Sequence, residues 1–66
     1  MRSISYNPLW KKLIDLKMSK AELAEKAGIS RSTLARMRKD EAVNLDVILK
    51  ICNALDCEAY DVLEIR

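Results

Sequence analysis

The sequence predicts an all-α domain of four to five short helices, on the basis of three observations. Apolar residues recur at helical spacing in separate segments of the chain. Residues that start and stop helices divide the 66-residue chain at short intervals. There is only one glycine and one proline, which is unfavourable for a β-rich fold with many turns. The length predicts a single domain over residues 1–66.

The first helix is predicted over residues 7–17, NPLWKKLIDLK. Asn7 is expected to cap it, and Pro8 takes the first helical position, where its missing N–H costs nothing. The apolar residues expected on its inner side are Leu9, Trp10, Leu13, Ile14 and Leu16. Core packing is favoured over base stacking for Trp10, and Tyr6 is compatible with either role.

Two further helices are predicted to form a helix–turn–helix over residues 19–39. Ser19 caps the first of them, and Glu22 completes a capping box. Gly28 follows as a left-handed stop, and Ser30 caps the next helix, residues 31–39. Ala24 supplies the small residue that a close helix crossing requires. The apolar contacts between the two helices are expected from Leu23, Ala27, Ile29, Leu34 and Met37.

The last third of the chain predicts a fourth helix over residues 45–56 with Asn44 as its cap. Its apolar face comprises Val47, Ile48, Ile51, Cys52 and Leu55. A final short turn at residues 59–63 carries Tyr60, Val62 and Leu63. The end segments SIS and LEI can be extended and can pair with each other.

Charge is distributed unevenly, although the net charge is only +2. Residues 1–28 carry +3, residues 40–66 carry −5, and residues 29–39 carry four basic side chains with no acidic one. This dipolar pattern predicts that one face of the domain meets an anionic polymer.

MSKAELAEKAGISRSTLARMRK, residues 18–39, resembles the helix–turn–helix of phage-repressor-like regulators of the Cro/CI or XRE type. Residues 44–63 match the last two helices of that family, and the N-terminal segment is similar to a subgroup of very short bacterial members. The resemblance covers residues 4–63. It implies a five-helix domain that binds double-stranded DNA, usually as a homodimer, and regulates transcription, here expected as a repressor. Many relatives have a WExG-like or ENG-like segment where this chain has RMRKDE, so phosphate contacts after the third helix are expected to differ.

On a helical wheel of residues 31–39, Leu34 and Met37 point inward and most of the polar side chains point outward. The predicted base contacts are Arg31, Ser32 and Arg36, because arginine can donate two hydrogen bonds to guanine in the major groove. The predicted phosphate contacts are Lys20, Thr33, Arg38, Lys39 and Asn44. Ser30 is expected to act as a cap, and Asn44 as a cap or a phosphate contact.

Other classes of function are disfavoured. An enzyme is improbable because there is no histidine, glycine-rich phosphate loop or activated nucleophile. No cofactor or metal is expected, since Cys52 and Cys57 cannot complete a zinc site and Cys52 is expected as a small buried side chain. No membrane span, signal peptide or small-molecule effector domain is expected, which predicts a cytoplasmic protein.

Two alternatives remain open from the sequence. In the first, the acidic C-terminal region and EAYDVLEI, residues 58–65, form a protein-interaction module. In the second, the chain is an antitoxin-like regulator that also binds a toxin. If the chain binds DNA, residues 58–65 would instead form the dimer interface.

Overall fold

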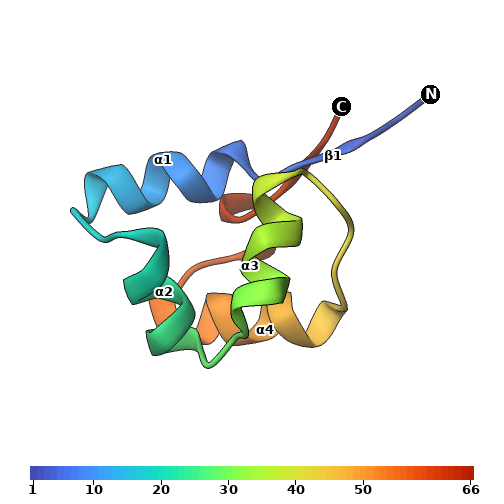
Figure 1. Ribbon diagram of the computed structural model, residues 1–66. Helices are drawn as coiled ribbons and strands as arrows, with labels where there is room; N and C mark the ends of the chain where they lie inside the picture. Colours follow the sequence, from blue (N-terminus) through green and yellow to red (C-terminus); the bar gives the residue numbers. More distant parts are fainter.

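The computed structural model describes residues 1–66 and confirms an all-α domain. The element order is β1 (Ile4–Ser5), α1 (Asn7–Asp15), α2 (Lys20–Ala27), α3 (Arg31–Arg38), α4 (Leu45–Leu55), the 3₁₀ turn η1 (Ala59–Asp61) and β2 (Glu64–Ile65). In Figure 1, α1 and α4 lie on opposite sides, and α2 and α3 connect them. No helix is both long enough and apolar enough to cross a membrane.

The two chain ends lie side by side, as expected for SIS and LEI (Figure 1). β1 pairs antiparallel with β2, with Ile4 opposite Ile65. Ser3 and Arg66 exchange two backbone hydrogen bonds of 2.8 Å. This short ladder fixes the segment that leads into α1, and therefore the position of Tyr6.

Helix starts follow the predictions at two places and depart from them at two others. At α2, Ser19 Oγ accepts from the Glu22 N–H at 3.1 Å, and Glu22 Oε1 accepts from the Ser19 N–H at 3.2 Å, which confirms the capping box. At α3, Ser30 Oγ accepts from the Thr33 N–H at 3.2 Å. The prediction for Asn7 was wrong: it is the first residue of α1, and its N–H donates to Ser5 Oγ of β1 at 3.3 Å.

Asn44 stands at the cap position of α4, but its side chain makes no capping hydrogen bond. The Val47 N–H donates instead to the backbone carbonyl of Asn44 at 3.0 Å. The prediction of a side-chain cap was therefore wrong, and the amide of Asn44 is free for another partner.

All four helices end with the same backbone hydrogen-bond motif. One or two residues after each helix stands a residue with positive φ, and the N–H of the residue after that one donates to the carbonyl five residues earlier. The positive-φ residues are Lys17, Gly28, Asp40 and Asp56. Only Gly28 was predicted, because lysine and aspartate rarely adopt this conformation. The early stops make α1 two residues shorter than predicted, and α3 and α4 one residue shorter.

Every helix contributes to one core. The cluster consists of Tyr6, Leu9, Leu13, Leu23, Met37, Ile48, Ile51 and Val62, with Trp10, Ala27, Ile29, Val47, Cys52, Leu55 and Leu63 among the partly buried residues packed against it. This confirms most of the predicted inner faces and places Tyr6 in the core. Ala24 and Leu34 are also buried.

Two predicted inner residues are exposed. Ile14 is 75% exposed because it lies about 100° further around α1 than Leu13. Leu16 is 49% exposed because it follows the last helical residue. Tyr60 in η1, for which the sequence predicted no inner position, is 77% exposed. Cys52, expected to be buried, is only partly so.

Candidate nucleic-acid interface

α3 stands at the front of the molecule in Figure 1 and is held from behind by its apolar side. Met37 is fully buried and Leu34 nearly so, as the helical wheel predicted. The opposite side of α3 faces solvent along its whole length, which leaves its polar side chains accessible.

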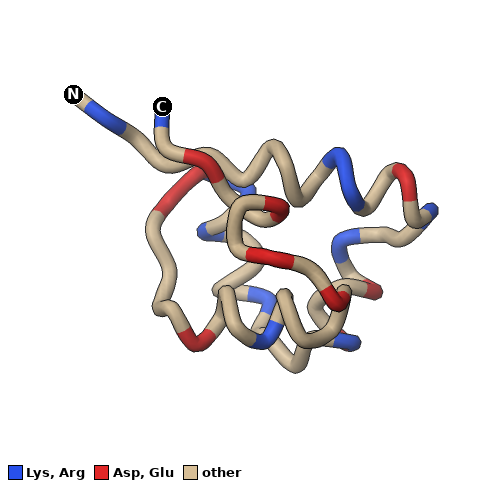
Figure 2. Tube along the Cα trace, turned by 180° about the vertical axis from the view of Figure 1, so that it is seen from behind, with Lys and Arg blue, Asp and Glu red and all other residues tan.

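Five basic side chains, one at the first residue of α2 and four in α3 and the residue after it, are exposed and have no acidic partner. They are Lys20, Arg31, Arg36, Arg38 and Lys39. The only ion pair in the structure joins Arg66 to Glu64 at 3.2 Å. Figure 2, drawn from behind, shows acidic positions along the segment after α4, on the face away from α3. The predicted dipolar arrangement is therefore present in the fold.

A hollow of about 520 Å³ lies between α2 and α3, and we call it the turn-side hollow. Lys20, Arg31 and Arg38 line it together with a single carboxylate, that of Glu25. Its remaining lining residues are Ala21, Ala24, Ile29 and Leu34. Since Arg31 and Arg38 are seven residues apart, they share one side of α3. Cations from two helices thus converge on one concave surface.

A second hollow, of about 220 Å³, lies on the other side of α3, next to the loop that leads to α4. We call it the loop-side hollow. Thr33, Arg36 and Asn44 contribute its polar groups, and Ala42, Val43 and Val47 complete it. Because the Asn44 amide does not cap α4, it can donate to or accept from a ligand here.

Ser32 and Lys39, the other two predicted contacts, line neither hollow. Both are exposed, and the helical wheel places them on the ridge between the two hollows. Ser32 Oγ lies 3.1 Å from Ser30 Oγ, and Ser30 Oγ donates to Thr33 Oγ1 at 2.9 Å. Because the Ser30 proton goes to Thr33, the Ser32 hydroxyl donates to Ser30 Oγ, belongs to the capping network at the start of α3 and can still accept hydrogen bonds.

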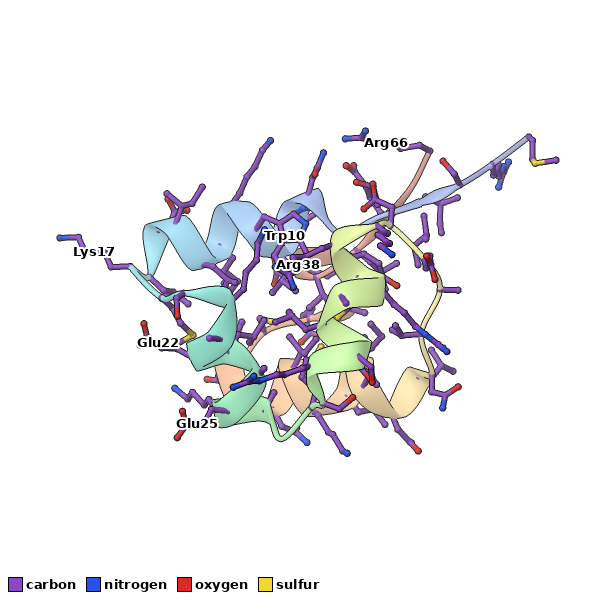
Figure 3. The ribbon with its side chains drawn as sticks, in the orientation of Figure 1. Trp10, Lys17, Glu22, Glu25, Arg38 and Arg66 are labelled. Carbon is purple, nitrogen blue, oxygen red and sulfur yellow. The ribbon has the colours of Figure 1, made fainter.

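The ammonium group of Lys20 contacts an aromatic residue of α1. Its ammonium lies 4.6 Å from the centre of the Trp10 ring, within the range of a cation–π contact. Figure 3 shows Trp10 extending from α1 into the space bordered by α2 and α3, where Arg38 is also labelled. No local pattern in the sequence signals this contact, because it joins two different helices.

Tyr6 fixes the loop that borders the loop-side hollow. Its hydroxyl donates to the carbonyl oxygen of Glu41 at 2.7 Å, and its backbone N–H donates to Asp40 Oδ1 at 3.3 Å. Burial, followed by the charge of Asp40, raises the pKa of Tyr6 above its ordinary value of 10.0. The sequence left the role of Tyr6 undecided because its partners are 34 and 35 residues away.

The two cysteines lie away from α3, at the end of α4. Both are free thiols. Burial, followed by the charge of the neighbouring Cys52, raises the pKa of Cys57 above its ordinary value of 9.0. No cluster of three or more His, Cys, Asp or Glu side chains suited to a metal ion is present.

Known proteins are similar to this chain in sequence. A family model described as the Cro/C1-type HTH DNA-binding domain matches residues 8–66. The HTH-type transcriptional regulator YozG of Bacillus subtilis (strain 168), itself described as uncharacterized, is 40% identical over 52 residues. That alignment covers 76% of this chain but only 62% of the relative, which is less than two thirds of its length.

A solved structure is similar over nearly the whole chain. The crystal structure of the transcriptional regulator VanUg, Form II, matches with a TM-score of 0.95 and 48% sequence identity, covering 98% of this chain and 87% of that one. The family match over residues 8–66, the two relatives and the geometry around α3 lead to one conclusion: the chain belongs to the Cro/C1-type helix–turn–helix family of DNA-binding transcriptional regulators.

Proposed function

We propose that this protein binds a specific sequence of double-stranded DNA with α3 in the major groove and acts as a transcriptional repressor. The observation that carries the proposal is the group of five exposed cations on and beside α3, none of which has an acidic partner. Unpaired arginine and lysine side chains gathered on one side of the molecule attract the phosphate backbone and release its counterions on binding.

The residues divide into two roles. Arg31, Ser32 and Arg36 contact base edges, because they extend from the exposed side of the helix that enters the groove. The phosphate contacts are Lys20, Thr33, Arg38, Lys39 and Asn44. Each hollow combines phosphate contacts with one of the two arginines assigned to bases, and it can receive a phosphate on one side of the groove. The turn-side hollow holds Lys20 and Arg38 beside Arg31, and the loop-side hollow holds Thr33 and Asn44 beside Arg36.

The functional unit is a homodimer. One short helix contacts only about 4–6 base pairs, too few for useful specificity, whereas two copies contact an inverted repeat with half-site centres about 34 Å apart. Residues 58–65 are proposed as the contact between the copies, because Tyr60 and Ile65 there are 77% and 60% exposed. Sedimentation that shows a monomer both free and on its operator would remove this part of the proposal.

Selection of binding sites from a randomised duplex pool at near-physiological salt, followed by sequencing, tests the proposal. An enriched inverted repeat is the expected result, and its spacing reports the dimer geometry. Binding without enrichment contradicts sequence specificity. The absence of binding contradicts the function and favours a protein-interaction module. Repression is then tested by placing the selected site over a promoter that drives a reporter, whose output should fall when the protein is expressed.

A further inference from the structure

We infer that Trp10 is a positioning residue for DNA binding: its indole ring holds the ammonium group of Lys20 at the turn-side hollow, where a phosphate of the duplex binds. The inference rests on the proposed function, and it assigns a role on the DNA side to a residue of α1 that packs against the core.

The first step is the contact itself. The Lys20 ammonium lies 4.6 Å from the Trp10 ring centre. Trp10 is partly buried and packed against the hydrophobic core, so its ring is a fixed support. Lys20 is exposed, so its ammonium remains accessible to a ligand. The ring occupies one side of the ammonium and leaves N–H donors free on the other.

The second step is that Lys20 stands where a helix does not favour a cation. It is the first residue of α2, at the positive end of the helix dipole. The cap of α2 is already complete, since Ser19 and Glu22 form a capping box without Lys20. Lys20 therefore contributes neither to the cap of α2 nor to a favourable interaction with the helix dipole. The π face of Trp10 partly compensates for its unfavourable position, and an anion would compensate for it further.

The third step is the surroundings of that ammonium. Lys20 lines the turn-side hollow with Arg31 and Arg38, against one carboxylate, and none of these groups forms an ion pair. The hollow thus carries an excess of positive charge that is not neutralised within the chain. The hollow lies beside α3, the helix proposed to enter the groove, so the anion expected to bind there is a phosphate of the DNA backbone.

The fourth step explains why the ring affects affinity. A lysine side chain has several rotatable bonds, and ordering them when a phosphate binds costs conformational entropy. The contact with Trp10 orders the side chain before DNA arrives, which lowers this cost. The ring therefore acts through Lys20, and its effect on DNA binding must vanish when Lys20 is removed.

A double-mutant cycle tests this dependence. The affinity of the parent protein, Trp10→Leu, Lys20→Ala and the double variant for a duplex of random sequence is measured at several salt concentrations. Lys20→Ala should lower the salt slope by about one. Trp10→Leu should weaken binding about two- to five-fold in the parent, the range of a partly exposed cation–π contact, and should have no further effect in the Lys20→Ala background.

Two variants serve as controls. Trp10→Phe retains an aromatic face and should restore part of the loss seen in Trp10→Leu. Lys17→Ala removes one cation that Figure 3 shows pointing away from α3, and it should leave the salt slope unchanged. If Trp10→Leu does not fold, Trp10→Phe keeps the cycle measurable.

The inference is overturned if the change at Trp10 weakens binding equally in both backgrounds, since its role is then structural, or if it has no effect while Lys20→Ala weakens binding. It is also overturned if NMR of the free parent shows no upfield ring-current shift of the Lys20 methylene protons. Failure of the parent to bind any duplex is a different result, which contradicts the proposed function and the inference together.

Discussion

The two connections of α3 are built in different ways. The turn before it, residues 28–30, is held by its own residues: Gly28 takes φ 72°, and Ser30 caps the helix that follows. The loop after it, residues 40–44, contains no glycine and no side-chain cap, and its first residue, Asp40, takes φ 57°. Tyr6, which lies 34 residues before Asp40 in the chain, holds this loop by two hydrogen bonds.

This difference shows how the orientation of α3 is set. The turn before it is fixed by local backbone and side-chain hydrogen bonds. Local hydrogen bonds also end α3, but the loop that follows is held in addition by Tyr6, a residue distant in the chain. A change in the turn should therefore reduce stability directly, whereas a change in the loop should act through the loop-side hollow and its polar groups.

The largest expected effect concerns the arginine beside the loop. Arg36→Ala should lose sequence preference, because removing a bidentate contact to guanine costs about 1–3 kcal/mol of discrimination. Lys39→Ala should instead weaken binding to all duplexes about equally and lower the salt slope by about one. Both are measured by titrating the selected site and a scrambled duplex at several salt concentrations.

If Arg36→Ala binds the selected site as tightly as the parent protein does, Arg36 does not contact bases. Equal losses on the selected and the scrambled duplex would assign Arg36 to the phosphate backbone instead.

The second prediction concerns a substitution in the turn before α3. At Gly28 a Cβ would meet no atom within 4 Å, so the cost of Gly28→Ala comes from the left-handed backbone alone. That conformation costs about 1–2 kcal/mol for an ordinary residue, offset in part by the smaller freedom of alanine in the unfolded chain. We expect a net loss of about 1 kcal/mol in the free energy of unfolding, measured by urea denaturation. Gly28→Asn should lose less, because asparagine tolerates this region. Equal losses for the two variants would argue against a backbone origin.

The sequence predicts the features that neighbouring residues determine, and it does not predict those that depend on residues of another element. The turn could be predicted because Gly28 and Ser30 carry their signals within three residues. The roles of Tyr6 and Trp10 could not, because each depends on a residue in another element. The stops at Lys17, Asp40 and Asp56 were missed because these residues adopt positive φ only rarely.

For the candidate interface, the helical wheel identified the exposed face of α3 correctly. It could not show that α3 separates two hollows, since their other walls come from α2 and from the loop. Six of the eight predicted contacts line one hollow or the other: Lys20, Thr33, Arg31, Arg36, Arg38 and Asn44. Their roles in binding DNA stay predictions.

The third prediction compares the two cap positions on either side of α3. Ser30→Ala should cost about 1 kcal/mol in the free energy of unfolding, because Ser30 Oγ accepts the Thr33 N–H. Asn44→Ala should cost only a few tenths, since the Asn44 side chain makes no cap bond. Asn44→Ala should still weaken DNA binding, because it removes an amide from the loop-side hollow. Equal stability losses would show that Asn44 caps α4 in solution.

The smallest expected effect concerns the anchor of the loop. Tyr6→Phe removes the hydrogen bond to the Glu41 carbonyl and should cost about 0.5–1 kcal/mol in the free energy of unfolding. This is the lower part of the usual range, because water can replace the donor at exposed Glu41.

The pH dependence of the free energy of unfolding distinguishes the loss of this hydrogen bond from a loss of packing. The pKa of Tyr6 is raised in the folded protein, so above its ordinary value of 10.0 the unfolded chain loses the phenol proton first. The native state then binds more protons than the unfolded state, and stability falls as pH rises.

Phenylalanine has no proton to lose, so Tyr6→Phe should lose less stability than the parent protein between pH 9 and 11, the region around the ordinary phenol pKa of about 10. The raised pKa of Cys57 also reduces stability at alkaline pH, but it is present in both proteins and cancels in the difference. Urea denaturation across this pH range measures the difference directly. If the two stability curves stay parallel, the Tyr6 hydroxyl does not make the hydrogen bond to the Glu41 carbonyl, and the loop after α3 is held by the backbone N–H of Tyr6 and by the packing of its ring.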